Sequence, residues 1–331
     1  MAVRRQFDWP GTLRPAPPAR GGFIWCVIIA VLGLSAPPFD VRAAAGEEGL
    51  LEPVADKVQL ELESIAADVQ GVMGIAVEDL AGQHRFAVNE GLQFAQASAI
   101  KIPILMEVLK QAHEGKLKLE EMHWIEKQYQ VAGSGVLGEL GHRTTQMSLE
   151  DLCVLMIVLS DNTATNMLID RVGMDEVNRT MESLGCRHTK LRRRMMDVAA
   201  AQRGDENVST PADAARIMRT LHEGQFVSRE VSDHVLAILR KDKPGDVKAA
   251  LPAGTSVAFK PGAIPGVAAE WAIVELERRP YIVVAMGGFG VKEEFKDAFR
   301  EVSKTAYEFF QRVATGTSYG GYIDPEEWNK R

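Results

Sequence analysis

The sequence of 331 residues predicts an α/β (α+β) fold with two lobes, in which one antiparallel β-sheet is built from both ends of the chain. Two β-strand patterns lie within residues 72–88, and three more follow residue 252. Between them, the apolar residues recur almost everywhere at helical spacing. We therefore expect a sheet flanked by helices, with an all-helical lobe inserted between its early and late strands.

The first elements of the sheet lobe come early in the chain. Residues Val54 to Ala67 have helical periodicity. Residues Val72 to Val77 and Gln83 to Val88 then predict two strands, which a turn at Ala81-Gly82 joins. Together with a preceding short stretch, these elements occupy about residues 46–90.

The helical lobe is expected to begin at about residue 91 and to end at about residue 249. From Ser98 to Leu184 the pattern is almost entirely helical. Ser148 with Asp151 three positions later is similar to a capping box, so we expect a helix to begin there and to end near residue 160.

The second half of this lobe contains a predicted long loop. Residues 191–209 have little periodicity. Thr210-Pro211 then indicates a new helix, because threonine is a favoured N-cap and proline suits the first helical position. Another helix is expected over about residues 228–240.

The pattern changes after Pro252, where the sheet lobe resumes over about residues 250–314. Three strands are predicted, with Gly/Pro turns between them, over residues 257–260, 268–276 and 281–287. A helix over about residues 292–313 closes the domain, and residues 315–331 form a polar tail without a core-forming pattern. A cleft between the two lobes is the expected site, since ligand pockets favour such boundaries.

The first 45 residues have the features of a signal peptide. Four arginines precede an apolar run from Phe23 to Leu34, and small residues follow at Ala43-Ala44-Ala45. We therefore expect a periplasmic or secreted protein, with an uncleaved membrane anchor as the less favoured alternative. Cys153 and Cys186 both lie in apolar helical patterns, so we expect two free, buried thiols.

Composition narrows the range of partners. The net charge is −7 and no basic stripe is present, which argues against nucleic acid. The seven histidines are scattered without metal-ligand spacing, and no nucleotide-binding glycine loop occurs, so we expect no metal and no cofactor. We expect the protein to act on a small-molecule substrate and to be a monomer.

Three short motifs carry the chemistry. Ser98 and Lys101 lie three residues apart in an apolar run, so one helix face holds both and desolvation lowers the pKa of the amine. Ser160-Asp161-Asn162 falls between two helical segments, and Lys260-Pro261-Gly262-Ala263 ends a predicted strand. Taken alone, the first motif is better explained by a capping serine and a snorkelling lysine, and the second by plain helix capping. The third is also explained by a turn with a solvated lysine.

Together and in this order, the motifs resemble those of the class A β-lactamases, which are S-x-x-K, S-D-N and K-T-G. The resemblance covers about residues 51–313 and implies a β-lactamase/transpeptidase-like fold. It implies that Ser98 is the acylated nucleophile, Lys101 its base, and Ser160 the proton relay to the leaving nitrogen. It further implies that the substrate is bound by Asn162, Lys260, Gly262 and Ala263, with the N–H groups of Ser98 and Ala263 as oxyanion donors.

The sequence departs from the family pattern in two places. Pro261 replaces the hydroxyl residue that would bind a substrate carboxylate. The glutamate position of the omega loop falls near Met195 and the asparagine position near Ala199, which leaves Asp197 as the nearby carboxylate. We therefore expect hydrolysis of a β-lactam or related amide with competent acylation and weak deacylation. The alternatives are a peptidase or esterase acting on cell-wall peptides, and a binding protein without turnover.

Overall fold

A five-stranded antiparallel sheet joins the two ends of the chain, as the sequence predicts. The computed structural model describes residues 49–82, 84–317 and 319–322. Its strands are β1 (Val72–Asp79), β2 (Arg85–Val88), β7 (Val257–Ile264), β8 (Val267–Val274) and β9 (Tyr281–Gly288). Across the sheet they lie in the order β2-β1-β9-β8-β7. Strand β1 pairs with β9 so that Val77 lies opposite Val283. The predicted α/β fold with two lobes is confirmed.

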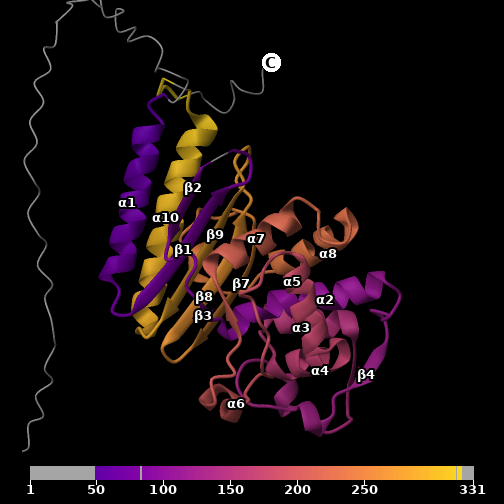
Figure 1. Ribbon diagram of the computed structural model, residues 1–331. Helices are drawn as coiled ribbons and strands as arrows, with labels where there is room; N and C mark the ends of the chain where they lie inside the picture. Colours follow the sequence, from indigo (N-terminus) through magenta and orange to yellow (C-terminus); the bar gives the residue numbers. More distant parts are fainter. Residues whose placement is uncertain (1–48, 83, 318, 323–331) are drawn as a thin grey trace, which may run out of the picture. The chain divides into compact units, whose positions relative to one another are not determined.

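The two terminal helices cover one face of this sheet (Figure 1). They are α1 (Glu52–Asp68) and α10 (Lys292–Thr315). Helix α10 turns Phe295, Phe299, Val302 and Phe309 inward at spacings of three, four and seven, which is the period of one helix face. These side chains form one of two apolar cores together with the residues of the sheet that face them.

The other face of the sheet packs against the helical lobe. Its helices are α2 (Lys101–His113), α3 (Leu149–Val158), α4 (Asn162–Val172), α5 (Met174–Ser183), α7 (Pro211–His222) and α8 (Arg229–Arg240). The short helix α9 (Asp246–Ala249) packs instead against α10, on the face that the terminal helices cover. Helix α2 is apolar around most of its circumference, and residues 101–109 are all buried in the second core. A helix of this character belongs inside a larger domain.

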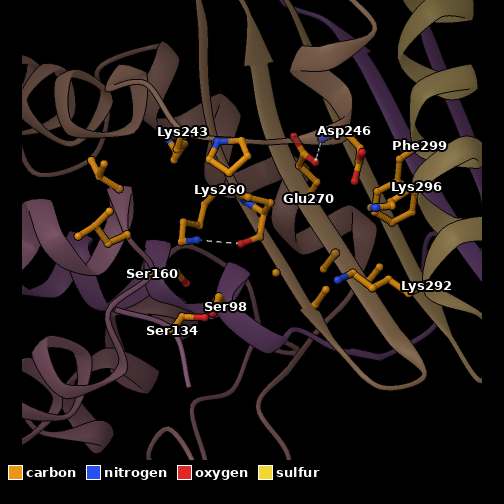
Figure 2. A pocket seen from close by; sticks show the side chains of 18 residues that line it. Ser98, Ser134, Ser160, Lys243, Asp246, Lys260, Glu270, Lys292, Lys296 and Phe299 are labelled. Carbon is orange, nitrogen blue, oxygen red and sulfur yellow. Dashed lines mark hydrogen bonds between the residues drawn. The ribbon is translucent and has the colours of Figure 1, made fainter. Parts of the chain in front are cut away.

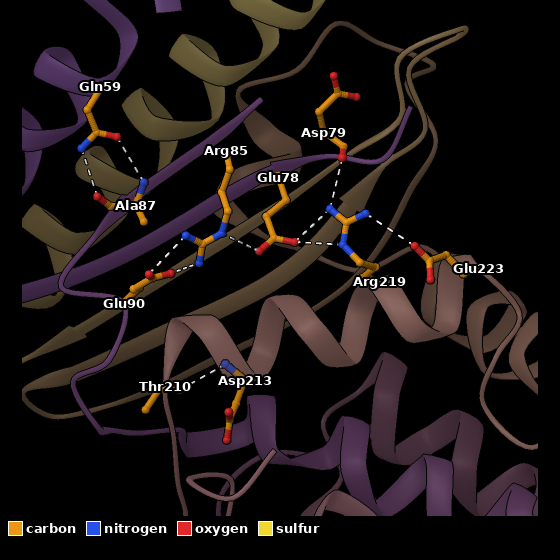
Figure 3. A network of polar contacts seen from close by, with 10 residues as sticks. All are labelled: Gln59, Glu78, Asp79, Arg85, Ala87, Glu90, Thr210, Asp213, Arg219 and Glu223. Carbon is orange, nitrogen blue, oxygen red and sulfur yellow. Dashed lines mark hydrogen bonds and ion pairs between the residues drawn. The ribbon is translucent and has the colours of Figure 1, made fainter. Parts of the chain in front are cut away.

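The helix caps that the sequence predicts are present. The Ser148 hydroxyl accepts a hydrogen bond from the backbone N–H of Asp151 at 3.0 Å. The Thr210 hydroxyl accepts one from the N–H of Asp213 at 3.1 Å, at the start of α7 (Figure 3). Each bond satisfies one of the free N–H groups that a helix start leaves.

An ionic network joins α7 to the edge of the sheet (Figure 3). Arg219 on α7 donates to the Glu78 carboxylate at 3.0 Å and to the Asp79 carbonyl at 3.1 Å, both on β1. Arg85 on β2 donates to the same Glu78 side chain at 3.1 Å and also pairs with Glu90. Because Glu78 is buried, its two arginine partners compensate for the lost hydration of the carboxylate.

The expectation that the stretch from Ser98 to Leu184 is almost entirely helical is wrong for residues 114–148. This stretch contains the paired strands β4 (Met122–Trp124) and β5 (Gln146–Ser148) and two 3₁₀ turns, over residues 127–129 and 137–139. Gly133 and Gly135 have φ values of 98° and 108°, which a helix does not allow. Apolar spacing alone did not reveal this interruption.

Two further elements differ from expectation. The predicted loop 191–209 contains the short helix α6 (Val198–Gln202) and strand β6 (Val208–Ser209), which pairs with β3 (Phe94–Ala95). Strand β7 continues through Pro261 to Ile264, although the motif suggested that it ends at Lys260. A proline is tolerated there because β7 is an edge strand.

Two remaining expectations concern the cysteines and the chain ends. Cys153 and Cys186 are free and buried, as expected, and burial raises the pKa of both thiols. The predicted signal peptide and most of the predicted tail lie outside the described residues. None of the described helices combines the length and the apolar character that a membrane span requires.

Candidate active site

The Ser98 backbone lies directly against strand β7. Ser98 belongs to the 3₁₀ turn η1 (Ala97–Ile100), which leads into α2. A Cβ atom at Gly262 would lie 2.5 Å from the Ser98 nitrogen and 2.7 Å from the Ala99 nitrogen. Only glycine allows this approach, so Gly262 brings the third motif against the first. Ala97 has a φ of 43°, and such backbone strain is concentrated at functional sites.

Lys101 is buried and reaches the second motif. Its Nζ donates to the Ser160 carbonyl at 2.7 Å, to the Ser160 hydroxyl at 3.2 Å and to Asn162 Oδ1 at 3.0 Å. No hydrogen bond joins Lys101 to the Ser98 hydroxyl among the described residues. Burial lowers the pKa of Lys101 well below that of a free lysine, the Lys260 charge adds to this effect, and the Asp161 carboxylate opposes it.

The Ser160-Asp161-Asn162 segment connects α3 to α4 in a strained conformation. Ser160 has a φ of 54°. Asp161 is buried, and its carboxylate caps α4 by accepting a hydrogen bond from the Ala164 N–H at 2.9 Å. The same carboxylate accepts hydrogen bonds from the backbone N–H groups of Val136 at 2.7 Å and Leu137 at 2.9 Å. This carboxylate therefore holds residues 134–137 beside the cleft.

Both polar ends of the Asn162 side chain are already used. Its Oδ1 accepts from Lys101, and its Nδ2 donates to the Ala132 carbonyl at 3.2 Å. Asn162 is buried and orients the Lys101 amine together with Ser160. Its contact with a substrate stays a prediction.

Lys260 occupies the middle of β7 and is 2% exposed. Its Nζ donates to the Pro261 carbonyl at 2.8 Å (Figure 2). Burial lowers the pKa of Lys260 to about 7, with a further contribution from the charge of Lys243, while Glu270 opposes the shift. The side chain is therefore a cation that loses its proton unusually easily.

One cavity of about 330 Å³ connects five of the seven predicted site residues. It is lined by Ser98, Ser160, Lys260, Gly262 and Ala263, and also by Pro261 (Figure 2). Lys101 and Asn162 do not line it, but they lie behind Ser160 through the bonds given above. The structure thus brings all seven residues to one place.

The omega-like loop presents no carboxylate to this cavity. The Asn166 side chain binds the backbone of Met195 with two hydrogen bonds. Its Oδ1 accepts from the Met195 N–H at 2.8 Å, and its Nδ2 donates to the Met195 carbonyl at 3.2 Å. The Met195 side chain is buried in the core. Asp197 is exposed and caps α6 through the Ala200 N–H at 2.9 Å. Neither Met195 nor Asp197 lines the cavity.

Sequence reasoning missed several residues that line the same cavity. Two of them are carboxylates, Asp246 and Glu270, and one is a buried lysine, Lys243. Glu270 carried a signal: it is a charged residue inside the apolar strand pattern 268–276, and charged residues are rarely buried without a specific reason. Among the described residues, no group of three or more His, Cys, Asp or Glu side chains could hold a metal ion.

Comparison with known proteins agrees with this geometry. A family model described as "Beta-lactamase enzyme family" matches residues 57–310. An imipenem-hydrolyzing β-lactamase of Enterobacter cloacae is 25% identical over 233 residues, which cover 68% of this chain and 79% of that protein. The β-lactamase CTX-M-97 of Escherichia coli is 27% identical over 216 residues, covering 64% of this chain and 74% of that protein.

Solved structures share the fold. A β-lactamase from Sphaerobacter thermophilus has a TM-score of 0.70 and 28% identity, over 77% of this chain and 97% of that one. PBP-A has a TM-score of 0.72 and 26% identity, over 77% and 96% of the two chains. The family match covers most of the described residues and includes all three motifs at the cavity. The chain is therefore a serine hydrolase that belongs to the β-lactamase enzyme family.

Proposed function

We propose that this protein attacks a β-lactam or related amide through an acyl-enzyme on Ser98 and releases the product slowly. One observation carries the proposal: the desolvated Lys101 amine contacts Ser160 beside Ser98, while no carboxylate of the omega-like loop lines the cavity. The first feature supports acylation, and the second supports slow deacylation.

In the acylation step, the Ser98 hydroxyl oxygen bonds to the substrate carbonyl carbon and its proton passes to the neutral Lys101 amine. The negative charge on the carbonyl oxygen is stabilised by the N–H groups of Ser98 and Ala263. When the carbonyl–nitrogen bond breaks, Lys101 returns the proton to the leaving nitrogen through the Ser160 hydroxyl, which lies 3.2 Å from Nζ. Lys260 biases this transfer with its charge and attracts an anionic substrate while it is protonated.

Release requires water to attack the Ser98 ester, and a general base accelerates such an attack. Met195 stands where the family glutamate is expected, and its side chain is buried and apolar. Lys101, the base of the acylation step, is then the motif residue that we expect to assist this attack. We infer that the acyl-enzyme accumulates and that β-lactams are turned over slowly.

A peptidase that acts on cell-wall peptides is the second candidate, and Pro261 favours it because a site without that hydroxyl lacks a bond to the carboxylate of a penicillin. For the first candidate, a PBP-A mutant whose solved structure is an acyl-enzyme complex with penicillin G is 26% identical to this chain. A binding protein without turnover is disfavoured, because it has no use for a desolvated lysine beside a serine. In all these cases we expect a periplasmic or secreted monomer.

Intact-protein mass spectrometry after incubation with penicillin G tests the proposal. We expect a stable adduct, located by proteolysis in the peptide that contains Ser98, together with little hydrolysis of a chromogenic cephalosporin. The Ser98→Ala variant should give no adduct. Rapid cephalosporin turnover would refute slow deacylation, and absence of an adduct with any lactam would refute acylation.

A further inference from the structure

Strand β8 brings a buried carboxylate to the cavity that Ser98 and Ser160 line. Glu270 lies opposite Pro261 in the β7–β8 register, so the two side chains share one face of the sheet. Glu270 lines the same cavity as Ser160, the expected proton donor to the leaving nitrogen. Figure 2 shows it beyond Lys260, on the side of Asp246 and Phe299. Its side chain is only 1% exposed.

One oxygen of Glu270 has a partner and the other has none. Oε2 accepts a hydrogen bond from the Asp246 backbone N–H at 2.9 Å. Oε1 has no hydrogen-bond partner among the described residues. Pro261, its neighbour across the strands, has no hydroxyl and no N–H to donate. A buried carboxylate oxygen without a donor is unfavourable, so a donor from a bound molecule would complete this site.

The lysines around the cavity do not supply this donor. Lys243 donates to the carbonyls of Leu239 at 2.5 Å and Lys241 at 2.8 Å, and its Nζ lies 4.1 Å from the centre of the Phe259 ring. Lys260 donates to the Pro261 carbonyl. Neither of these two lysines forms an ion pair with Glu270.

Two lysines of α10 and one more carboxylate complete the charges around the cavity. Lys296 pairs with Glu293 at 2.9 Å, and Asp246 pairs with Arg300 at 3.0 Å. Lys292 is exposed, so solvent screens its charge. Of the two carboxylates that line the cavity, Glu270 is therefore the one without an ion pair among the described residues.

The protonation states of the buried groups favour the same conclusion. Burial lowers the pKa of Lys260 to about 7 and that of Lys243 to about 8. Burial raises the pKa of Glu270 to about 7, although the backbone N–H groups of Asp246 and Val247 oppose the shift. Above neutral pH, Glu270 is therefore ionised while the nearest buried lysines lose their charges.

Building on the acyl-enzyme chemistry proposed above, we propose that Glu270 selects substrates whose leaving-group portion carries a cationic hydrogen-bond donor, a primary ammonium. The same carboxylate repels a carboxylate at that position. The substrate class is then an amide or lactam with an amine near the leaving nitrogen, and Glu270 is its specificity determinant.

Three matched lactams test this inference at pH 8: penicillin G, its carboxamide, and the analogue in which an aminomethyl group replaces the carboxylate. Mass spectrometry gives the rate of Ser98 acylation by each. Calorimetry with the Ser98→Ala variant gives the dissociation constants without chemistry. We expect the aminomethyl probe to acylate and bind about ten-fold better than the carboxylate, because a hydrogen bond to a charged group is stronger than a neutral one.

Glu270→Gln keeps an oxygen for the Asp246 N–H and should abolish this ranking. Asp246→Asn is the matched control, because its carboxylate lines the same cavity but already pairs with Arg300, and it should keep the ranking. A ranking that survives Glu270→Gln, or equal rates and affinities for the three probes, would overturn the inference while acylation stands. If no probe acylates Ser98 but the ammonium preference in binding depends on Glu270, the acylation proposal fails and the cation site stands.

Discussion

Substitution of Gly262 by alanine should separate the nucleophile from the strand that faces it. The new Cβ would lie 2.5 Å from Ser98 N, 2.7 Å from Ala99 N and 2.8 Å from Gln96 O. All three atoms are backbone, so no side chain can rotate away. Restoring an ordinary contact of ~3.5 Å requires η1 and β7 to move apart by ~1 Å.

A displacement of this size affects both stability and chemistry. Forcing extra volume into a packed contact lowers the free energy of unfolding by ~1–3 kcal/mol. A misplacement of ~1 Å at the reacting groups reduces the rate ~100-fold. We therefore expect Gly262→Ala to lose about two orders of magnitude in the Ser98 acylation rate, measured by the growth of the penicillin adduct in intact-mass spectra.

Gly288→Ala is the matched control. Gly288 also lies in a strand of the sheet, but a Cβ there meets only Phe94 Cδ1, at the ordinary contact distance of 3.7 Å. This variant should acylate like the unmodified protein. If Gly262→Ala acylates within about three-fold of the control and unfolds at the same urea concentration, the close approach of η1 and β7 does not constrain the site.

Three further predictions concern charge, release and loop anchoring. The pKa of Lys260 is about 7 in the folded protein and 10.5 in the unfolded reference, so the unfolded chain binds more protons between these pH values and the free energy of unfolding should rise with pH from 7 to 10. Lys260→Met should make this rise smaller in urea titrations, and the part that stays comes from the other buried lysines with lowered pKa, Lys243 and Lys101. Met195→Glu places a carboxylate where the family pattern has its glutamate; because a charge is costly to bury, we expect this side chain to leave the apolar core that holds Met195, to act as a base at the cavity and to shorten the lifetime of the Ser98 adduct by about 100-fold. An unchanged lifetime in mass spectrometry would show that this position does not serve release. Asp161→Ala removes the acceptor of the buried Leu137 N–H and of the neighbouring Val136 N–H. It should lower the free energy of unfolding, measured by urea titration, by ~1–3 kcal/mol. A loss below ~0.5 kcal/mol would contradict the anchoring role of Asp161.

Much of the fold could be predicted because local patterns agree with the tertiary structure. The apolar stripe of α10 and the cap at Thr210 report burial and hydrogen bonding over a few residues, and the structure keeps both. The segment 114–148 could not be predicted in this way. Its course depends on Asp161, more than twenty positions away, which holds the backbone N–H groups of Val136 and Leu137.

The candidate site could likewise be predicted only where local sequence carries the information. The residue types of the three motifs identify Ser98, Lys101 and Lys260, but spacing suggested that the lysine amine faces Ser98, whereas its bonds run to Ser160 and Asn162. Which side chain meets a lysine across two elements is decided by tertiary packing. Glu270 shows the same limit: its lack of a partner at Oε1 is a property of the assembled β7–β8 pair.

The pairing of β1 with β9 also determines the order in which this protein can fold. Val77 on β1 pairs with Val283 on β9, so the central strand pair of the sheet cannot form until nearly the whole chain has been synthesised. Contacts between such distant positions have a large loop-closure entropy to overcome and form slowly. Until then β1, whose residues 73–79 are all buried in the finished sheet, exposes an apolar edge to other chains. The same strand order that joins the two ends of the chain in one sheet therefore leaves the nascent chain open to aggregation for longer than a fold with local pairing would.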